Sequence, residues 1–122
     1  MKIELTRFKV KPGKTERVDE WLKMLNDNKP AVLPTLIDEK MYVEVIFREF
    51  KDGNEYLYWF SIQGEGGSSI QESQHEVDLK HIAYSNECLD RTYKPDELDP
   101  QVIMIPDRIL KAFIDSNLLK EG

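Results

Sequence analysis

The sequence predicts an α+β fold built around an antiparallel sheet. Residues 40–50 and 55–63 are rich in β-branched and aromatic residues, which favour strands. The letters KDGN between them contain the Asp-Gly pair that favours a tight hairpin turn. Residues 15–28 place apolar side chains at helical spacing, and residues 70–93 contain neither Gly nor Pro. A hairpin between two helices therefore organises the chain.

The chain opens with a predicted half-buried strand over residues 2–10, where apolar residues alternate roughly with charged ones. Pro12 and Gly13 supply the turn that stops it, and Thr15 can cap the helix that follows. We expect this helix to run to about Asn28. Its apolar residues recur at spacings of three and four: Val18, Trp21, Leu22 and Leu25.

Prolines divide the rest of the chain. Pro30 and Pro34 interrupt the first helix, and residues 31–39 have room for one short helical turn. The letters KPDELDP end the second helix, and the apolar run QVIMI, residues 101–105, is predicted as a strand inside the sheet. Pro106 opens a last helix with one apolar side. That side contains Ile109, Leu110, Phe113, Ile114 and Leu118.

The predicted order is βαββαβ with an appended C-terminal helix. Right-handed crossovers would place both flanking helices on one face of a four-stranded antiparallel sheet, which is the split βαβ, or ferredoxin-like, arrangement. We expect a single domain over residues 1–122, with a core at 1–105 and the last helix at 106–120.

Charge and cysteine content narrow the function classes. Seventeen Lys and Arg against 23 Asp and Glu give a net charge of −6, which repels phosphate backbones and anionic lipid. No apolar run approaches the ~18 residues of a membrane span. The lone Cys88 cannot form an internal disulfide, and the first residues mix charges with apolar side chains, unlike a signal peptide. We expect a cytoplasmic protein that binds neither nucleic acid nor membrane.

His81 is the first candidate site residue. On a helix it shares a face with Val77, Tyr84 and Cys88, which indicates that it faces the sheet. The structural interpretation, which weighs more, is a buried histidine bonded to a neighbour such as Asp78. The functional interpretation is an acid-base or ligand-orienting residue, because imidazole titrates near neutrality. His75 lies about 120° away, so a metal site is not expected.

Glu44 and Arg48 lie on one strand face, four residues apart. Buried charges need partners, so a structural ion pair or exposure at an edge is the first interpretation. Alternatively, Arg48 receives a ligand carboxylate or enolate while Glu44 acts as a base. The aromatic residues Tyr58, Trp59 and Tyr84 are further candidates for lining a pocket, although rings in a sheet are more often core.

The opening FKVKPGKTERVDEWLKML resembles that of the dimeric α/β-barrel superfamily, a ferredoxin-like group that includes antibiotic-biosynthesis monooxygenases and haem-degrading relatives. The whole chain also resembles a family of short bacterial proteins known only as a domain of unknown function. The superfamily resemblance implies a homodimer with sheets packed face to face, and a pocket between sheet and helices. Both faces of the predicted hairpin carry large apolar residues, which independently favours an interface.

The resemblance implies a small organic ligand and, if the protein is an enzyme, cofactor-free oxygenation or isomerisation of an activated aromatic or carbonyl substrate. His81 or Glu44 would remove a proton and Arg48 would hold the anion. No cofactor is expected, haem included. The alternative is a non-catalytic dimeric module used for assembly or as a sensor. The expected lining is Glu44, Arg48, Tyr58, Trp59, His81 and Tyr84.

Overall fold

The computed structural model describes residues 1–121, with side chains described to Ser116. Its helices and strands follow the predicted βαββαβ order, with an additional short helix after the first crossover helix and a last helix appended. The elements are β1 (Lys2–Lys9), α1 (Thr15–Asp27), α2 (Lys29–Asp38), β2 (Met41–Lys51), β3 (Asn54–Gln63), a 3₁₀ turn (Ile70–Glu72), α3 (Glu76–Cys88), β4 (Asp96–Leu98) and α4 (Asp107–Glu121).

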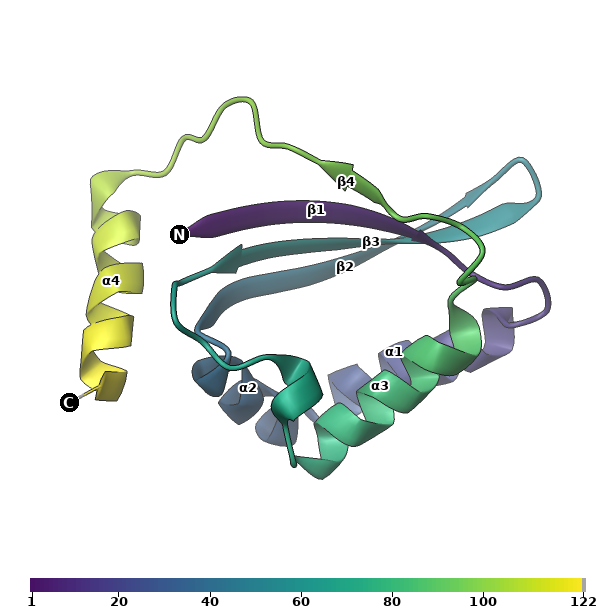
Figure 1. The fold of residues 1–122 in the computed structure, drawn as a ribbon, viewed down its shortest axis with the longest axis horizontal. Coiled ribbons are helices and arrows are strands. Elements are labelled where there is room, and N and C mark those ends of the chain that lie inside the picture. The colour runs from purple at the N-terminus through teal and green to yellow at the C-terminus, as the bar shows by residue number, and fades with distance from the viewer. Residues whose placement is uncertain (122) are drawn as a thin grey trace.

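The four strands form one antiparallel sheet in the order β2-β3-β1-β4. Figure 1 shows α1, α2 and α3 on one side of this sheet, while α4 stands beside its end near the N-terminus. The predicted α+β class, sheet and appended helix are confirmed, and the arrangement is compatible with a ferredoxin-like fold. Among the described residues, no helix is both long and apolar enough to cross a bilayer.

The hairpin between β2 and β3 forms as its turn residues predict. Asp52 and Gly53 both have positive φ, 52° and 78°. Two successive residues with positive φ are what a type I′ turn requires, and this turn matches the twist of the flanking strands. The ladder then runs from Lys51 paired with Asn54 back to Met41 paired with Gln63.

The core lies between the sheet and the α1–α3 layer. Trp21 and Val18 of α1, Leu57 of β3 and Cys88 of α3 are fully buried. Along β3, Leu57 and its alternate neighbours face the helices, so the residues between them face the other side, which no helix covers in Figure 1. This uncovered side is called the open face below. Its side chains on β3 are Tyr56, Tyr58, Phe60 and Ile62.

The predicted strand at residues 101–105 is wrong. The fourth strand is Asp96–Leu98, which pairs with β1 through Leu5↔Leu98 and Arg7↔Asp96. Prolines flank these three residues, and proline is compatible with an edge strand because one side of such a strand needs no donors. The apolar run is also not buried, since Met104 is 85% exposed. The apolar run at residues 101–105 is therefore an exposed surface segment and not a strand inside the sheet.

Two helices differ in length from expectation. Residues 29–38 form a complete helix, α2, because Pro30 lies in its first turn, where no helical donor is needed, and Pro34 removes only one interior bond. The second crossover helix is shorter than predicted. Ser73 and His75 are extended, and α3 runs only over Glu76–Cys88.

The last helix contacts the sheet through an aromatic pair. Phe113 stacks on Tyr42 of β2 with ring centroids 4.8 Å apart and an interplanar angle of 2°. Ile109 and Ile114 on the same helix are about half exposed, at 49% and 52%. The predicted apolar side of α4 is therefore only partly covered, and the side chain of Leu118 lies outside the described residues.

Candidate functional site

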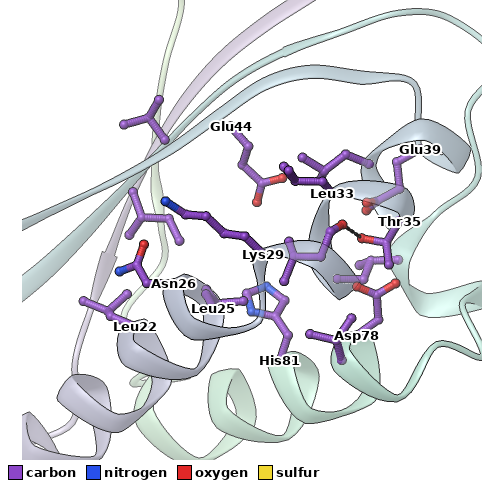
Figure 2. Close-up of a pocket in the computed structure, with 16 residues that line it drawn as sticks. Leu22, Leu25, Asn26, Lys29, Leu33, Thr35, Glu39, Glu44, Asp78 and His81 are labelled. Carbon is purple, nitrogen blue, oxygen red and sulfur yellow. Dashed lines mark hydrogen bonds between the residues drawn. The ribbon is translucent and has the colours of Figure 1, made fainter.

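A cavity of about 410 Å³ lies between β2 and the three helices α1, α2 and α3 (Figure 2). This volume and lining are typical of small-molecule sites, which combine apolar walls with a few polar groups. The apolar walls are Leu22, Leu25, Val32, Leu33, Leu36, Val45, Ile46, Ile70 and Val77. The polar residues are Asn26, Lys29, Thr35, Glu39, Glu44, Asp78 and His81.

Local structure brings the acidic residues to this cavity. Glu44 reaches it because even-numbered residues of β2 alternate toward the helices. Glu39 follows the end of α2, and Asp78 lies in the first turn of α3, one turn before His81. The loop after β3 holds the end of α2 in place: a Cβ at Gly67 would lie 2.0 Å from the Glu39 carbonyl oxygen, so only glycine fits this approach.

His81 accepts a hydrogen bond on Nδ1 from the indole Nε1 of Trp21, at 2.8 Å. Because Nδ1 is the acceptor, the neutral ring carries its proton on Nε2. Burial lowers the pKa of His81. The negative charge of Asp78 partly opposes this shift. The imidazole is therefore neutral at pH 7, with one nitrogen fixed by the core.

Glu44 accepts a hydrogen bond from the indole Nε1 of Trp59, at 2.7 Å. Burial raises the pKa of Glu44, the Trp59 bond lowers it, and the charge of Asp78 raises it. Burial, followed by the charges of Glu44, Asp78 and Asp38, raises the pKa of Glu39 to about 7. Glu39 thus keeps its proton to near neutrality, mainly because it is partly buried and also because carboxylates lie near it.

The two indole rings and His81 form one packed group. The Trp21 and Trp59 centroids are 5.5 Å apart, and each ring lies 5.4 to 5.6 Å from the His81 ring. A second cavity of about 220 Å³ also touches these three residues. His81 therefore lines both cavities.

The structure brings Glu44 and His81 together in the larger cavity, with Trp59 bonded to Glu44. Arg48 lies elsewhere. Its Nε donates to Glu55 at 2.7 Å, its Nη1 to Asp19 at 2.5 Å and its Nη2 to the backbone oxygen of Thr15 at 3.1 Å. Although Glu44 and Arg48 share a strand face, they meet different partners, and Arg48 forms the ion pair of the structural interpretation.

Tyr58 and Tyr84 also lie outside the larger cavity. Tyr58 is on the open face, where its hydroxyl donates to Glu49 at 2.7 Å. Tyr84 stacks against Trp21 with an interplanar angle of 4°, and the Arg17 guanidinium lies 4.9 Å from its ring centre. Both rings have contacts that explain them without a ligand.

Sequence reasoning missed Glu39, Lys29 and Thr35 as lining residues and treated Asp78 only as a neighbour of His81. The position of Asp78 three residues before His81 was an available signal. Glu39 had none, because its place depends on α2 folding as a complete helix. Among the described residues, no group of three or more His, Cys, Asp or Glu could hold a metal ion.

We predict that Arg48→Ala lowers the free energy of unfolding by about 3 kcal/mol, because it leaves the carboxylate of Glu55, only 7% exposed, without its cation. Lys23→Ala removes an exposed ion pair with Asp27 and should cost less than about 1 kcal/mol. Urea unfolding at one fixed protein concentration measures both. Equal losses for the two variants would contradict the structural role of Arg48.

We predict that Trp21→Phe raises the pKa of His81, because protonation at Nδ1 no longer displaces an indole donor. Trp59→Phe is the control, since Trp59 donates to Glu44 instead and should leave this pKa nearly unchanged. NMR titration of the His81 Cε1 proton measures both variants. In the parent protein the lowered pKa makes stability fall as pH drops below about 6.5 toward the folded-state pKa.

Of three comparisons with known proteins, one gives a match, which is to a protein-family model. Neither the curated proteins nor the solved structures contain a match to this chain. A model of a family of unknown function, DUF6176, matches residues 1–111, which confirms the resemblance to such a family. The chain belongs to the DUF6176 family, whose function is unknown.

Proposed function

We propose that this protein binds a small organic molecule in the cavity between β2 and the helices α1, α2 and α3. The observation that carries the proposal is the lining, which combines apolar walls with four ionisable side chains: Glu39, Glu44, Asp78 and His81. Groups whose pKa is shifted by burial and by each other collect at functional sites more often than elsewhere. A structural core would have little reason to keep these groups around open space.

Proton transfer in this cavity stays a prediction. Glu44 has a raised pKa and His81 is neutral, so either group can accept a proton from a bound carbonyl or aromatic compound. The resulting anion needs a donor or cation, and Arg48 is already bonded to Glu55 and Asp19. Cofactor-free oxygenation or isomerisation is therefore less supported than ligand binding alone.

We also propose a homodimer formed through the open face of the sheet, as the resemblance to dimeric α/β barrels implies. Phe47 is 55% exposed and pairs with Tyr58 across the hairpin, so both lie on this face. Residues 98–105 add an exposed apolar segment that borders a cavity of about 380 Å³ beside Leu5 and Phe60. A contiguous apolar surface of this kind favours an interface.

The buried free thiol of Cys88 fits a reducing, cytoplasmic setting.

The alternative is a non-catalytic dimeric module used for assembly or as a sensor. The contacts of Arg48, Tyr58 and Tyr84 favour it, because each has a structural partner. This alternative and the ligand-binding proposal separate experimentally, since only the latter needs the cavity to be free.

We predict that the protein purified from its own host retains an organic molecule, and that Leu33→Trp abolishes the retained mass by filling the cavity. Leu33 is 55% exposed at the cavity wall, so a larger ring there should not disrupt the core. Leu79→Trp is the matched control, because Leu79 is 51% exposed on α3 and does not line the cavity. Native mass spectrometry measures the retained mass. Absence of extra mass in the parent protein, or equal retention in both variants, would contradict ligand binding.

We predict that Phe47→Glu converts the dimer to a folded monomer, because two carboxylates would otherwise be buried in the interface. Phe50→Glu is the control: Phe50 is 64% exposed near the hairpin tip, on the side of Arg48. Sedimentation velocity gives the mass and circular dichroism checks the fold. A parent protein that sediments as a monomer would refute the proposed dimer.

A further inference from the structure

We propose that the ligand of the cavity is an organic amine, whose ammonium group is received by Asp78, Glu44 and Glu39 while its apolar body lies against the walls. This inference rests on the proposed ligand binding and names the class of ligand.

Asp78 is a nearly buried carboxylic acid in the lining of the cavity. It is 5% exposed, and no hydrogen bond or ion pair joins its carboxylate to any residue that the structure describes. In Figure 2 this carboxylate points toward Thr35 and Glu39. The Thr35 hydroxyl already donates to the Val32 carbonyl at 2.7 Å. Buried polar groups in folded proteins normally have partners, and because Asp78 lines the cavity, solvent or a ligand in that cavity can supply them.

The helix end explains only part of this arrangement. Asp78 lies in the first turn of α3, where the helix dipole favours a negative charge. That effect stabilises the charge but supplies no hydrogen bond to the carboxylate oxygens from the described side chains. A ligand group with several N–H donors would supply them, and an ammonium carries up to three.

The lining of the cavity is acidic as a whole. Glu39, Glu44 and Asp78 line it together, and no ion pair links them to a cation among the described residues. Lys29 also lines the cavity, but it is exposed, and Figure 2 shows its Nζ apart from the Glu39 and Asp78 carboxylates. Carboxyl groups at these three positions favour an incoming cation over an anion.

An organic cation fits this lining better than a metal ion. Ca²⁺ and Mg²⁺ need several oxygens within about 2.6 Å of one point. The described His, Cys, Asp and Glu residues form no group that could hold a metal ion. An ammonium donates hydrogen bonds of about 2.7–2.9 Å in up to three directions, so it does not need all its oxygens close to one point. The cavity, about 410 Å³ in all, also has room for an apolar body.

The proton on Glu39 gives amine binding a pH dependence. Burial, and after it the charges of Glu44, Asp78 and Asp38, raise the pKa of Glu39 to about 7. Lys29 lines the same cavity, and His75 pairs with Asp38 at 3.3 Å. A bound ammonium favours the ionised form of Glu39, so binding releases a proton and strengthens as pH rises from 6 to 8. His81 contributes little to this window, because burial lowers its pKa.

The test compares three probes of similar size: 2-phenylethylamine, 2-phenylethanol and phenylacetate. Each is titrated at pH 8 while the amide signals of the cavity residues are followed by NMR. We expect the amine to bind at least about tenfold more tightly than the alcohol, because charge-assisted hydrogen bonds are the stronger ones, and phenylacetate to bind most weakly. Glu39→Gln should remove the rise in amine affinity between pH 6 and 8.

Variants identify the receiving group. Asp78→Asn should weaken amine binding at least about tenfold and leave the alcohol within about twofold. Asp27→Asn is the control, since Asp27 is an exposed carboxylate of α1 that pairs with Lys23. If Asp78→Asn does not fold, Glu44→Gln replaces it with the same expected selectivity.

The outcomes separate this inference from the proposed function. Alcohol or phenylacetate binding as tightly as the amine would overturn the amine assignment and leave ligand binding supported. Equal loss of amine and alcohol binding in the variants would also overturn it, because the carboxylate would then act only through the shape of the cavity. If none of the three probes shifts a cavity signal, both the amine inference and the binding site itself are refuted.

Discussion

The indole of Trp21 connects the layers on which the cavity depends. It is fully buried, it contacts the Trp59 ring from the sheet, and its N–H bonds to His81 of α3. One side chain of α1 thereby fixes both the distance between sheet and helices and the orientation of the imidazole. Because a buried indole N–H needs an acceptor, His81 is held neutral, with Nδ1 toward the core. The cavity forms beside this contact.

The acidic residues that line the cavity lower the stability of the folded chain near neutral pH. The raised pKa of Glu39 means that the folded chain binds more protons than the unfolded chain between about pH 4.5 and 7. Stability contributed by Glu39 therefore falls as pH rises through this range. Neutral replacements would relieve the repulsion, so keeping these carboxylates favours a functional role over a structural one.

Local sequence signals predicted the parts of the fold that local chemistry determines. The Asp-Gly pair set the hairpin turn, and the spacing of Val18 and Trp21 set the inner face of α1. The predicted strand at residues 101–105 was wrong because an apolar run indicates that burial is favourable but does not show which element, if any, buries it. The actual edge strand, Asp96–Leu98, is polar and short, so its pairing with β1 left no periodic pattern.

The site was predictable only in part for a related reason. Alternation along β2 placed Glu44 and Arg48 on one strand face without showing which face meets the helices. Their different partners depend on where Trp59 and Glu55 lie on the next strand. The cavity itself depends on α2, and the two prolines of this helix led us to expect only a short helical turn there. Contacts between elements distant in the sequence decide such features, and these contacts cannot be predicted directly from a single sequence.

The most direct test of this account is the pKa of Glu39 in the ligand-free protein, measured by NMR titration of its side-chain carboxyl carbon. We expect about 7, because Glu39 is partly buried and the charges of Glu44, Asp78 and Asp38 lie near it. A value close to 4.5, the ordinary one for a glutamate, would show that these carboxylates do not share an enclosed space. The cavity described here would then not exist in solution in this form.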